Sequence, residues 1–504
     1  MGPMEKKGAQ RSRVLELLEH HGGLQPGVAK KIQAETGVPE ADIYGVATFY
    51  TLVARPGVQM RVCQGLSCKM AGCDDHIAQL KADGVAYEAV SCLGQCDRAP
   101  VAVDDELKLV AWGQRGDVTP DDPELPMNLG GTDDLTYAAL ALARQIGPEM
   151  VIAELQASAL QGRGGAGFPA HFKWKAVRGE AEPVKYVVVN ADEGEPGTFK
   201  DREVMLRRPH LMLEGMAIAA FCAGAKVAFI YIRGEFTKPI REIREAIEAA
   251  REHIGWLQIE VVTGHGAYIC GEETALLEAI EGRRGMPRLK PPYPTQFGLW
   301  GKPTLMNNVE TLACVPSIVT RGGAWFKDQG RTEPGSKLYC ISGHVVNPGV
   351  YELPLGVNLD ELVEAAGGYV GTPKAFSPGG ASSGFLPMSF RDTPLDFGSL
   401  VKVGSMFGSS GVVVLNDTVN MARAAQWQQV FFEDESCGQC APCRIGCRIQ
   451  RQAVDRFLDD GDRSGLDNVD DVSWEMDAGS ICGLGMVASW PLQSAMKHFP
   501  EDFS

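Results

Sequence analysis

The stretch SCGQCAPCRIGC (436–447) determines how the rest of the chain has to be organised. Its first three cysteines follow a C-x2-C-x2-C spacing, and a further cysteine lies in GSICGLG (479–485). Three thiolates at this spacing can bind one face of an iron–sulfur cube, and a fourth ligand then comes from elsewhere in the chain. The sequence therefore predicts a [4Fe–4S] site whose first three ligands are Cys437, Cys440 and Cys443.

The fourth ligand has two candidates, Cys482 and Cys447. Cys447 lies one helical turn beyond Cys443 if a helix has started there. A zinc site or buried structural cysteines are the alternatives to a cluster, although three such closely spaced ligands favour [4Fe–4S] over zinc.

The charge and cysteine content of the chain exclude several classes of function. The 504 residues carry a formal net charge of -16, which argues against nucleic acid and against an anionic membrane surface as partners. Several of the 14 cysteines are clustered at ligand-like spacings, and the first residues, MGPMEKKGAQRSR, lack an apolar signal segment. We therefore expect metal chemistry in a reducing cytoplasm.

No stretch predicts direct membrane insertion. The most apolar window, 211–232, contains Glu214 and Lys226 and is typical of a buried helix followed by a strand. Any membrane contact would be made through another subunit.

Residues 1–57 are expected to form a helical bundle. Apolar residues recur at helical spacing, and a Gly-Gly pair and a proline separate short helices. The densely apolar run IYGVATFYTLV (43–53) is expected to dock on the module that follows it.

Residues 58–115 change to a pattern of short strands and contain two cysteine pairs. The pairs are C-x4-C and C-x3-C, and two such pairs can hold a flat [2Fe–2S] rhomb with two thiolates on each iron. Zinc is the alternative, but zinc pairs usually have the tighter C-x2-C spacing. Cys73 is left over as a packed or free thiol. The expected ligands are Cys63, Cys68, Cys92 and Cys96.

The strings YGVATFYT, CQGLSC (63–68) and SCLGQC (91–96) resemble the thioredoxin-like [2Fe–2S] subunit of complex I, preceded by its small helical bundle. The resemblance covers the first two modules, and every ligand position is filled. Residues 116–135, rich in Pro, Asp and Gly, are expected to be a linker.

Residues 136–333 are expected to form a Rossmann-like nucleotide-binding module. The loop GRGGAGFP (162–169) satisfies G-x-G-x-x-G, but it follows a helical segment instead of a strand, so the motif alone decides nothing. Buried-type strands alternate with helices at 184–190, 208–224, 226–232, 238–253 and 257–262. This order implies a parallel sheet with ligands bound beyond the carboxyl ends of its strands.

The polar loops of this module provide a cationic and an acidic set of side chains. Arg163 and Lys173 make the glycine loop able to bind phosphate. The acids are too many for a bare phosphate pocket and suit hydrogen bonding to flavin, ribose or nicotinamide groups. These acids are Asp192, Glu193, Glu195, Glu272 and Glu273.

The module closely resembles the NADH-oxidising flavoprotein subunit of complex I. The strings that match in order are GRGGAGFP, NADEGEPGTFKDR, YICGEETAL, GRRGMPRLKPPYP and NNVET, and SCGQCAPCR with Cys482 completes the set. The family places its last cluster ligand at the position of Cys482, which favours this residue over Cys447.

The resemblance implies that the chain binds FMN and NAD(H). FMN would be held by the positions Gly162, Arg163, Gly164, Lys173, Asn190, Asp192, Tyr268, Gly271, Glu272, Asn307, Asn308 and Thr311. The NADH adenine would lie between aromatics near Phe168 and Tyr293. The rest of the dinucleotide would be held by Glu195, Glu273 and Lys290.

One position departs from the family pattern. The family usually has a second aromatic shortly after the HFKW-like segment, whereas Lys175 and Ala176 follow Trp174 here. Adenine stacking would therefore be weaker, or be shared with another side chain.

The last two modules complete the predicted architecture. Residues 337–368 have the pattern of two strands, a Pro-Gly turn and a helix. The resemblance implies that residues 334–415 are a small β-grasp domain, from which we expect no chemistry. Residues 416–504 are expected to be a helical domain that carries the [4Fe–4S] cluster. The fold class is thus a multidomain α/β protein.

The cofactor set implies a route for electrons. Hydride transfer moves two electrons at once, an iron–sulfur cluster accepts one, and a flavin can convert one process into the other. The resemblance implies a diaphorase subunit that moves electrons between NAD(H), FMN and the clusters, with the N-terminal cluster as a side reservoir. Because the two complex I-like parts are fused, the expected partner is the catalytic subunit of a molybdenum- or tungsten-containing formate dehydrogenase, carrying further iron–sulfur clusters.

Other interpretations stay open at this point. The partner could be an NAD-reducing hydrogenase, or the chain a complex I variant. A non-catalytic scaffold with zinc in both cysteine sets is the alternative from another class. NADP is less expected than NAD, since a 2′-phosphate usually seeks Arg and this pocket is acidic.

Overall fold

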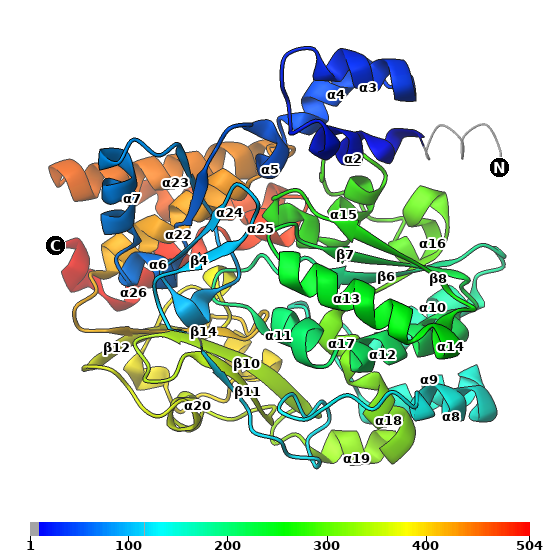
Figure 1. Ribbon diagram of the computed structural model, residues 1–504. Coiled ribbons are helices and arrows are strands. Elements are labelled where there is room, and N and C mark those ends of the chain that lie inside the picture. The colour runs from blue at the N-terminus through cyan, green and yellow to red at the C-terminus, as the bar shows by residue number, and fades with distance from the viewer. Residues whose placement is uncertain (1–9, 115) are drawn as a thin grey trace.

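The computed structural model describes residues 10–114 and 116–504, and it is a multidomain chain of mixed helices and strands (Figure 1). The predicted fold class is confirmed. The first nine residues of the predicted bundle, and residue 115 at the end of the predicted thioredoxin-like segment, lie outside the described residues.

The central sheet is parallel and has the strand order β8-β7-β6-β9. Its strands are β6 (Tyr186–Ala191), β7 (Val227–Ile232), β8 (Gln258–Thr263) and β9 (Thr304–Asn308). The predicted alternation of strands and helices is confirmed, and β9 adds a strand that the sequence did not reveal. The helices of this module are α8 (Ala138–Ile146), α9 (Pro148–Ser158), α10 (Ala170–Gly179), α11 (Lys200–Arg207), α12 (Pro209–Ala223), α13 (Thr237–Ala249), α14 (Arg251–Ile254), α15 (Glu273–Ile280), α16 (Pro294–Phe297), α17 (Val309–Ala313), α18 (Val315–Arg321) and α19 (Gly323–Asp328).

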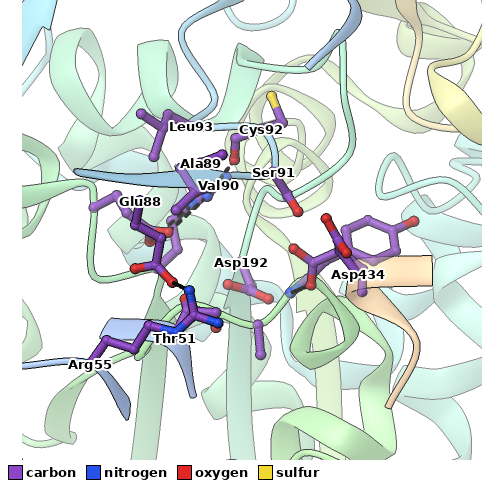
Figure 2. Close-up of a pocket in the computed structure, with 17 residues that line it drawn as sticks. Thr51, Arg55, Glu88, Ala89, Val90, Ser91, Cys92, Leu93, Asp192 and Asp434 are labelled. Atoms are coloured by element: carbon purple, nitrogen blue, oxygen red, sulfur yellow. Dashed lines mark hydrogen bonds and ion pairs between the residues drawn. The ribbon is translucent and has the colours of Figure 1, made fainter. Parts of the chain in front are cut away.

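A smaller sheet of order β2-β1-β3-β4 forms the thioredoxin-like module. The loop after β2 carries Cys92 and approaches the carboxyl end of the central sheet near Asp192 (Figure 2). The elements of this module are β1 (Met60–Cys63), α6 (Leu66–Met70), α7 (Cys73–Ala82), β2 (Tyr87–Val90), β3 (Val101–Asp104) and β4 (Leu109–Ala111).

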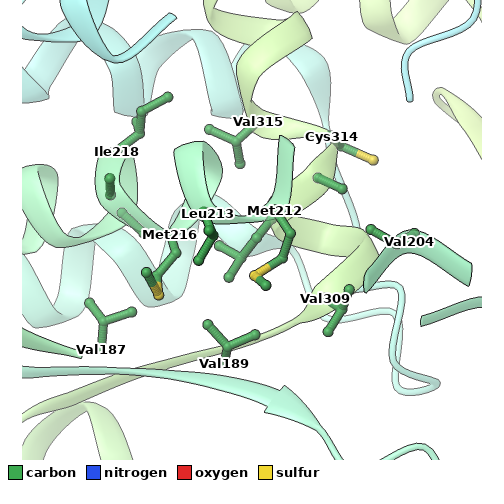
Figure 3. Close-up of a cluster of buried hydrophobic side chains, with 14 of the residues drawn as sticks. Val187, Val189, Val204, Met212, Leu213, Met216, Ile218, Val309, Cys314 and Val315 are labelled. Carbon is green, nitrogen blue, oxygen red and sulfur yellow. The ribbon is translucent and has the colours of Figure 1, made fainter. Parts of the chain in front are cut away.

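Helix α12 is the core of the central module. Met212, Leu213 and Met216 lie over Val187 and Val189 of β6 (Figure 3). A helix that is apolar on every side has to be enclosed by protein, and here the sheet and neighbouring helices enclose it. The apolar window therefore is a buried helix followed by β7, as predicted. Among the described helices, none is long and apolar enough to cross a bilayer.

The N-terminal helices cover the opposite face of the central sheet. Val46 and Tyr50 share an apolar cluster with Val188, Phe229 and Tyr231. The run 43–53 was expected to dock on the module that follows it. It packs instead on the central sheet, which is far away in sequence. The physical reason is that a buried parallel sheet needs cover on both faces. The helices are α2 (Arg13–His20), α3 (Val28–Thr36), α4 (Glu40–Ala47) and α5 (Thr51–Ala54).

A third sheet follows, with the order β13-β12-β14-β10-β11-β5. Its edge strand β5 (Asp117–Val118) comes from the segment predicted as a linker and pairs in parallel with β11. The linker is therefore tied to this sheet. The other elements are β10 (Ser336–Gly343), β11 (Gly349–Pro354), α20 (Leu359–Ala365), β12 (Pro373–Ser377), β13 (Leu386–Pro387), α21 (Phe397–Lys402) and β14 (Gly411–Asn416).

A Glu352→Gln variant should be more stable than the parent protein above neutral pH. Glu352 on β11 is buried, accepts hydrogen bonds from Met127 N and Ser336 Oγ, and burial raises its pKa from 4.5 to about 7. The unfolded chain releases this proton near pH 4.5 and the folded protein only near pH 7, so wild-type stability falls as pH rises through that window.

The variant removes this loss, by at most about 3 kcal/mol. Urea unfolding at pH 4.5 and pH 8 measures it. A difference between the two proteins that does not grow with pH would contradict the account.

The C-terminal helical region holds the predicted [4Fe–4S] ligands and Cys447. Cys437 and Cys440 lie between the first two helices, and Cys482 precedes the fourth. The helices are α22 (Met421–Glu435), α23 (Ala441–Asp460), α24 (Val469–Gly479), α25 (Gly483–Val487) and α26 (Trp490–His498).

Candidate functional site

A cavity of about 300 Å³ lies at the carboxyl end of β6, where a parallel sheet is expected to bind its ligand. Its walls come from the glycine loop, the loops after β6 and β8, the third sheet and the segment that begins at Cys482. The predicted site residues that line it are Gly164, Asn190, Asp192, Glu193, Glu195, Tyr268, Gly271, Glu272 and Asn308.

Side-chain hydrogen bonds fix the asparagines of this cavity. Asn190 Nδ2 donates to Gly271 O at 2.8 Å, and Asn308 Nδ2 donates to Asp201 Oδ2 at 2.6 Å. A Cβ on Gly164 would lie 3.1 Å from Asn308 Cβ, so a larger residue would have to displace Asn308 by a few tenths of an ångström. The glycine loop thus packs closely against Asn308.

Other predicted positions do not line the cavity but form hydrogen bonds with elements next to it. Asn307 Oδ1 accepts from Trp174 Nε1 at 2.9 Å, and Thr311 Oγ1 accepts from the backbone N–H of Arg163 at 2.8 Å. Gly162 N donates to Phe168 O at 2.8 Å and closes the glycine loop.

Glu195 and Tyr268 form a hydrogen-bonded pair on the wall of the cavity. The Tyr268 hydroxyl donates to Glu195 Oε2, and Ser382 N donates to Glu195 Oε1 at 2.9 Å. Burial raises the pKa of Glu195, although these two donors oppose the rise. The pair can exchange hydrogen bonds with a polar ligand without leaving a charge unpaired.

A group of charged side chains lies at the edge of the site. Lys173 Nζ contacts Glu273 Oε2 at 2.8 Å, and Lys290 Nζ contacts Glu272 at 3.0 Å and Glu273 at 3.1 Å. Burial opposes the ionised form of Glu273, but the two lysines hold its pKa below the ordinary value. The cluster presents both donors and acceptors to a ligand.

Asp192 lies between this cavity and a second one of about 360 Å³. Figure 2 shows it between Glu88 and Cys92 of the thioredoxin-like module on one side and Asp434 on the other. Asp192 Oδ2 has no hydrogen-bond partner among the described residues, and burial raises the pKa of this carboxyl to about 8. At neutral pH its neutral form can donate a hydrogen bond to a ligand.

The charged groups of two predicted binding residues are engaged by other parts of the protein. The guanidinium of Arg163 is fully buried and donates to Pro334 O at 3.0 Å, so it does not present a cation to the glycine loop. The carboxylate of Glu193 accepts from Asp201 N at 2.9 Å and Arg202 N at 3.0 Å. It therefore caps helix α11, as acids commonly do at helix starts.

The sequence reasoning missed several residues of the cavity. Lys200 and Asp201 belong to the matched string 191–202 but were not singled out. The β-grasp segment, from which no chemistry was expected, forms a whole wall. Its Gly/Ser-rich strings FSPGGASSG (376–384) and GSMFGSS (404–410) were a usable signal. The cavity residues from these strings are Gly379, Ser382, Met406, Gly408 and Ser409.

The predicted aromatic positions are outside the cavity and half exposed. Phe168 is 51% and Tyr293 is 54% exposed. Phe172 on α10 is 55% exposed, and its ring centroid lies 6.2 Å from that of Phe168. Although no aromatic residue stands at 175–176, Phe172 places a second aromatic ring next to Phe168. Phe172 lies one helical turn before the position where the family usually has its second aromatic.

The four N-terminal cysteines fit a [2Fe–2S] cluster. All four are buried, Cys92 Sγ and Cys96 Sγ are 3.5 Å apart, and the Cys63 thiol contacts those of Cys68 and Cys92. The N–H of Gly65 points at Cys63 Sγ (3.4 Å) and that of Gly94 points at Cys92 Sγ (3.3 Å). Such N–H···S contacts stabilise thiolate ligands of a cluster.

The C-terminal cysteines fit a [4Fe–4S] cluster. The four predicted ligands share one cluster of side chains, in which Cys443 and Cys482 are buried and Cys437 and Cys440 are half-buried. A Cβ on Gly485 would lie 2.9 Å from Cys443 Cβ, so the segment after Cys482 lies directly against the C-x2-C-x2-C loop. Cys482 also lines the ligand cavity.

Cys447 is on helix α23, as the spacing predicted, and neighbours one ligand candidate. Its Sγ lies 3.9 Å from Cys443 Sγ, and this hydrogen bond lowers the pKa of Cys443 to about 7. Cys447 is therefore close enough to stabilise the thiolate of Cys443.

A nucleotide cavity between two four-cysteine sets defines an oxidoreductase of the iron–sulfur flavoprotein class. Family models match in the same order: thioredoxin-like [2Fe-2S] ferredoxin over residues 3–111, Nuo51 FMN-binding domain over 155–317, SLBB domain over 338–386 and NADH-ubiquinone oxidoreductase-F iron-sulfur binding region over 423–504. The chain belongs to the family of NADH-quinone oxidoreductase F subunits. Its cofactors are FMN, a [4Fe–4S] and a [2Fe–2S] cluster.

The chain is similar to the following two relatives and one solved structure. The chain is 46% identical over 382 residues to the NADH-quinone oxidoreductase F subunit numbered 2 of Rhizobium meliloti (strain 1021), covering 72% of this chain and 90% of the relative. It is 44% identical over 373 residues to the NADH-quinone oxidoreductase F subunit of Rickettsia bellii (strain OSU 85-389), covering 71% and 89%. A chain of an NAD+-reducing [NiFe]-hydrogenase in the H2-reduced state is 29% identical with a TM-score of 0.90, covering 97% of this chain and 92% of that one.

Proposed function

We propose that this chain is the diaphorase subunit of an NAD-linked oxidoreductase complex and moves electrons between NAD(H), FMN and its clusters. The observation that carries the proposal is the position of Cys482, which lines the ligand cavity and shares a side-chain cluster with Cys437, Cys440 and Cys443. A flavin in the cavity would thus border a cluster ligand. FMN, when bound, supplies the chemistry that accepts a hydride and passes on single electrons.

The residues of the chain have distinct tasks in this proposal. The glycine loop, Lys173, Asn190, Asn308 and Tyr268 would position FMN, and Asp192 would donate a hydrogen bond to it. Glu195, Glu273 and Lys290 would hold the dinucleotide. The predicted cysteine ligands would hold the two clusters, with the [2Fe–2S] cluster on the far side of the cavity from Cys482.

The test of this function is anaerobic purification followed by addition of NADH. Bound FMN, iron and sulfide, together with NADH-dependent bleaching of the visible absorbance, are expected. Absence of flavin, or clusters that NADH does not reduce, would reject the diaphorase role, and zinc in place of iron would favour a scaffold.

For the partner, we propose the catalytic subunit of a molybdenum- or tungsten-containing formate dehydrogenase that carries further iron–sulfur clusters. We place the complex in the cytoplasm, where thiols are kept reduced. The fused architecture supports a complex of this general type. The likeness to the NAD+-reducing [NiFe]-hydrogenase supports a hydrogenase partner as the second candidate. Formate- versus hydrogen-dependent NAD+ reduction by the native assembly distinguishes the two.

A Phe172→Ala variant should weaken NADH binding as much as Phe168→Ala does. Both rings are half exposed beside the glycine loop, and stacking of a base on an aromatic side chain contributes about 1–3 kcal/mol. The KM for NADH should rise roughly tenfold in each variant, with kcat nearly unchanged. Steady-state kinetics with an artificial acceptor measure this.

Trp474→Ala, which truncates an exposed ring on α24, is the control. An unchanged KM in Phe172→Ala would show that Phe172 does not share in adenine stacking.

A further inference from the structure

Two buried arginines of the central module hold the loop that carries Cys92 and Cys96. Arg202 on α11 donates from Nη1 to Gly94 O at 2.8 Å and pairs with Asp97 at 2.7 Å. Arg233, directly after β7, donates from Nη2 to Cys92 O at 2.7 Å. The thioredoxin-like module therefore depends on the central module for the shape of this loop.

Arg233 makes a second contact that Arg202 lacks. Its Nη1 donates to Glu193 O at 2.7 Å, and Glu193 lies between Asp192 and Gly194 on the wall of the ligand cavity. One planar guanidinium thus binds a carbonyl from each of two loops, one beside the flavin cavity and one at a cluster cysteine. A lysine ammonium lacks the rigid fork that makes this bridge possible.

The charge on Arg233 is fixed. An arginine stays protonated in proteins, and the buried guanidinium of Arg233 pairs with Glu235 Oε1 at 3.1 Å. Glu435 on α22 is another carboxyl group that interacts electrostatically with this guanidinium. A permanent buried cation next to a cluster ligand favours the reduced, more negative state of the cluster, because reduction potentials respond to local charge and hydrogen bonding.

We propose that Arg233 is a positioning residue that ties the [2Fe–2S] loop to the flavin cavity and raises the reduction potential of that cluster. The proposal rests on the proposed function, since it takes Cys92 as a cluster ligand. In this proposal one side chain holds the [2Fe–2S] loop in place beside the flavin cavity. The same side chain contributes to the reduction potential of the [2Fe–2S] cluster.

Redox titration of the full chain, followed by the EPR signal of the [2Fe–2S] cluster, tests the proposal. In Arg233→Gln the ratio of reduced to oxidised cluster at a fixed potential should fall about tenfold, which corresponds to about 59 mV for a one-electron centre. Arg233→Lys retains the charge but not the double contact, so it should show a smaller shift in the same direction and a changed EPR line shape. Both should bind FMN.

Arg207→Gln, a partly exposed arginine that pairs with Glu203 on α11, is the matched control and should keep the wild-type potential. If Arg233→Gln loses its cluster, the potential and EPR line shape of Arg233→Lys test the proposal instead. Wild-type potential and line shape in a cluster-containing Arg233→Lys would overturn the proposal. A wild-type chain without any [2Fe–2S] signal would instead reject the proposed function, so the two failures are distinguishable.

Discussion

A Cys482→Ala variant should lose the [4Fe–4S] cluster and with it all electron transfer from NADH to the partner subunit. A cubane needs four ligands, and the segment after Cys482 lies against the loop that provides the other three. Iron and sulfide analysis and the EPR spectrum of the reduced protein measure the loss. Reduction of an artificial acceptor that takes electrons at the flavin should persist.

Cys447→Ala is the matched control, because Cys447 is equally buried and its sulfur lies 3.9 Å from Cys443 Sγ. This variant should keep the cluster, with at most a changed potential. The opposite pattern, loss of the cluster in Cys447→Ala and its retention in Cys482→Ala, would exchange the roles of the two cysteines.

A Glu310→Ala variant should be destabilised by about 3–5 kcal/mol. Glu310 at the start of α17 is fully buried, forms ion pairs with Lys337 and, at 3.0 Å, with Lys200, and accepts from Leu338 N at 2.9 Å. Its removal leaves two buried ammonium groups, of which Lys200 still pairs with Asp201 at 2.8 Å. The midpoint of urea unfolding measures the effect.

Glu124→Ala, which breaks the exposed pair with Arg321, should cost less than about 1 kcal/mol and serves as the control. Adding Lys337→Met to Glu310→Ala should restore part of the stability, since it removes one stranded charge. A Glu310→Ala midpoint close to that of the control would mean that the network contributes little.

Short-range sequence patterns predicted the fold class and the location of the site. The alternation of strands and helices from 184 to 262 was sufficient to predict a parallel sheet, and acids at adjacent strand ends marked the edge where the cavity lies. Both features depend on short-range spacing, which a single sequence displays directly.

Side-chain direction and long-range partners could not be derived in this way. Arg163 lies in a glycine loop, yet its guanidinium is buried and donates to Pro334 O, and the carboxylate of Glu193 at the cavity wall caps a helix. The strand β5 and the docking of 43–53 depend on surfaces that are distant in sequence. Side-chain directions and distant contacts depend on which buried polar groups need hydrogen-bond partners. Those groups are brought together only in the folded chain.

The edge strand β5 has a consequence for how the chain behaves on dilution. Because the thioredoxin-like part is anchored by covalent continuity and by the pairing of Asp117 and Val118 with the neighbouring sheet, its encounter with the rest of the molecule is intramolecular. Two separate chains with the same contacts would part once their concentration fell below the dissociation constant, whereas tethering at millimolar effective concentration keeps them together. Electron transfer within this polypeptide should therefore be independent of protein concentration.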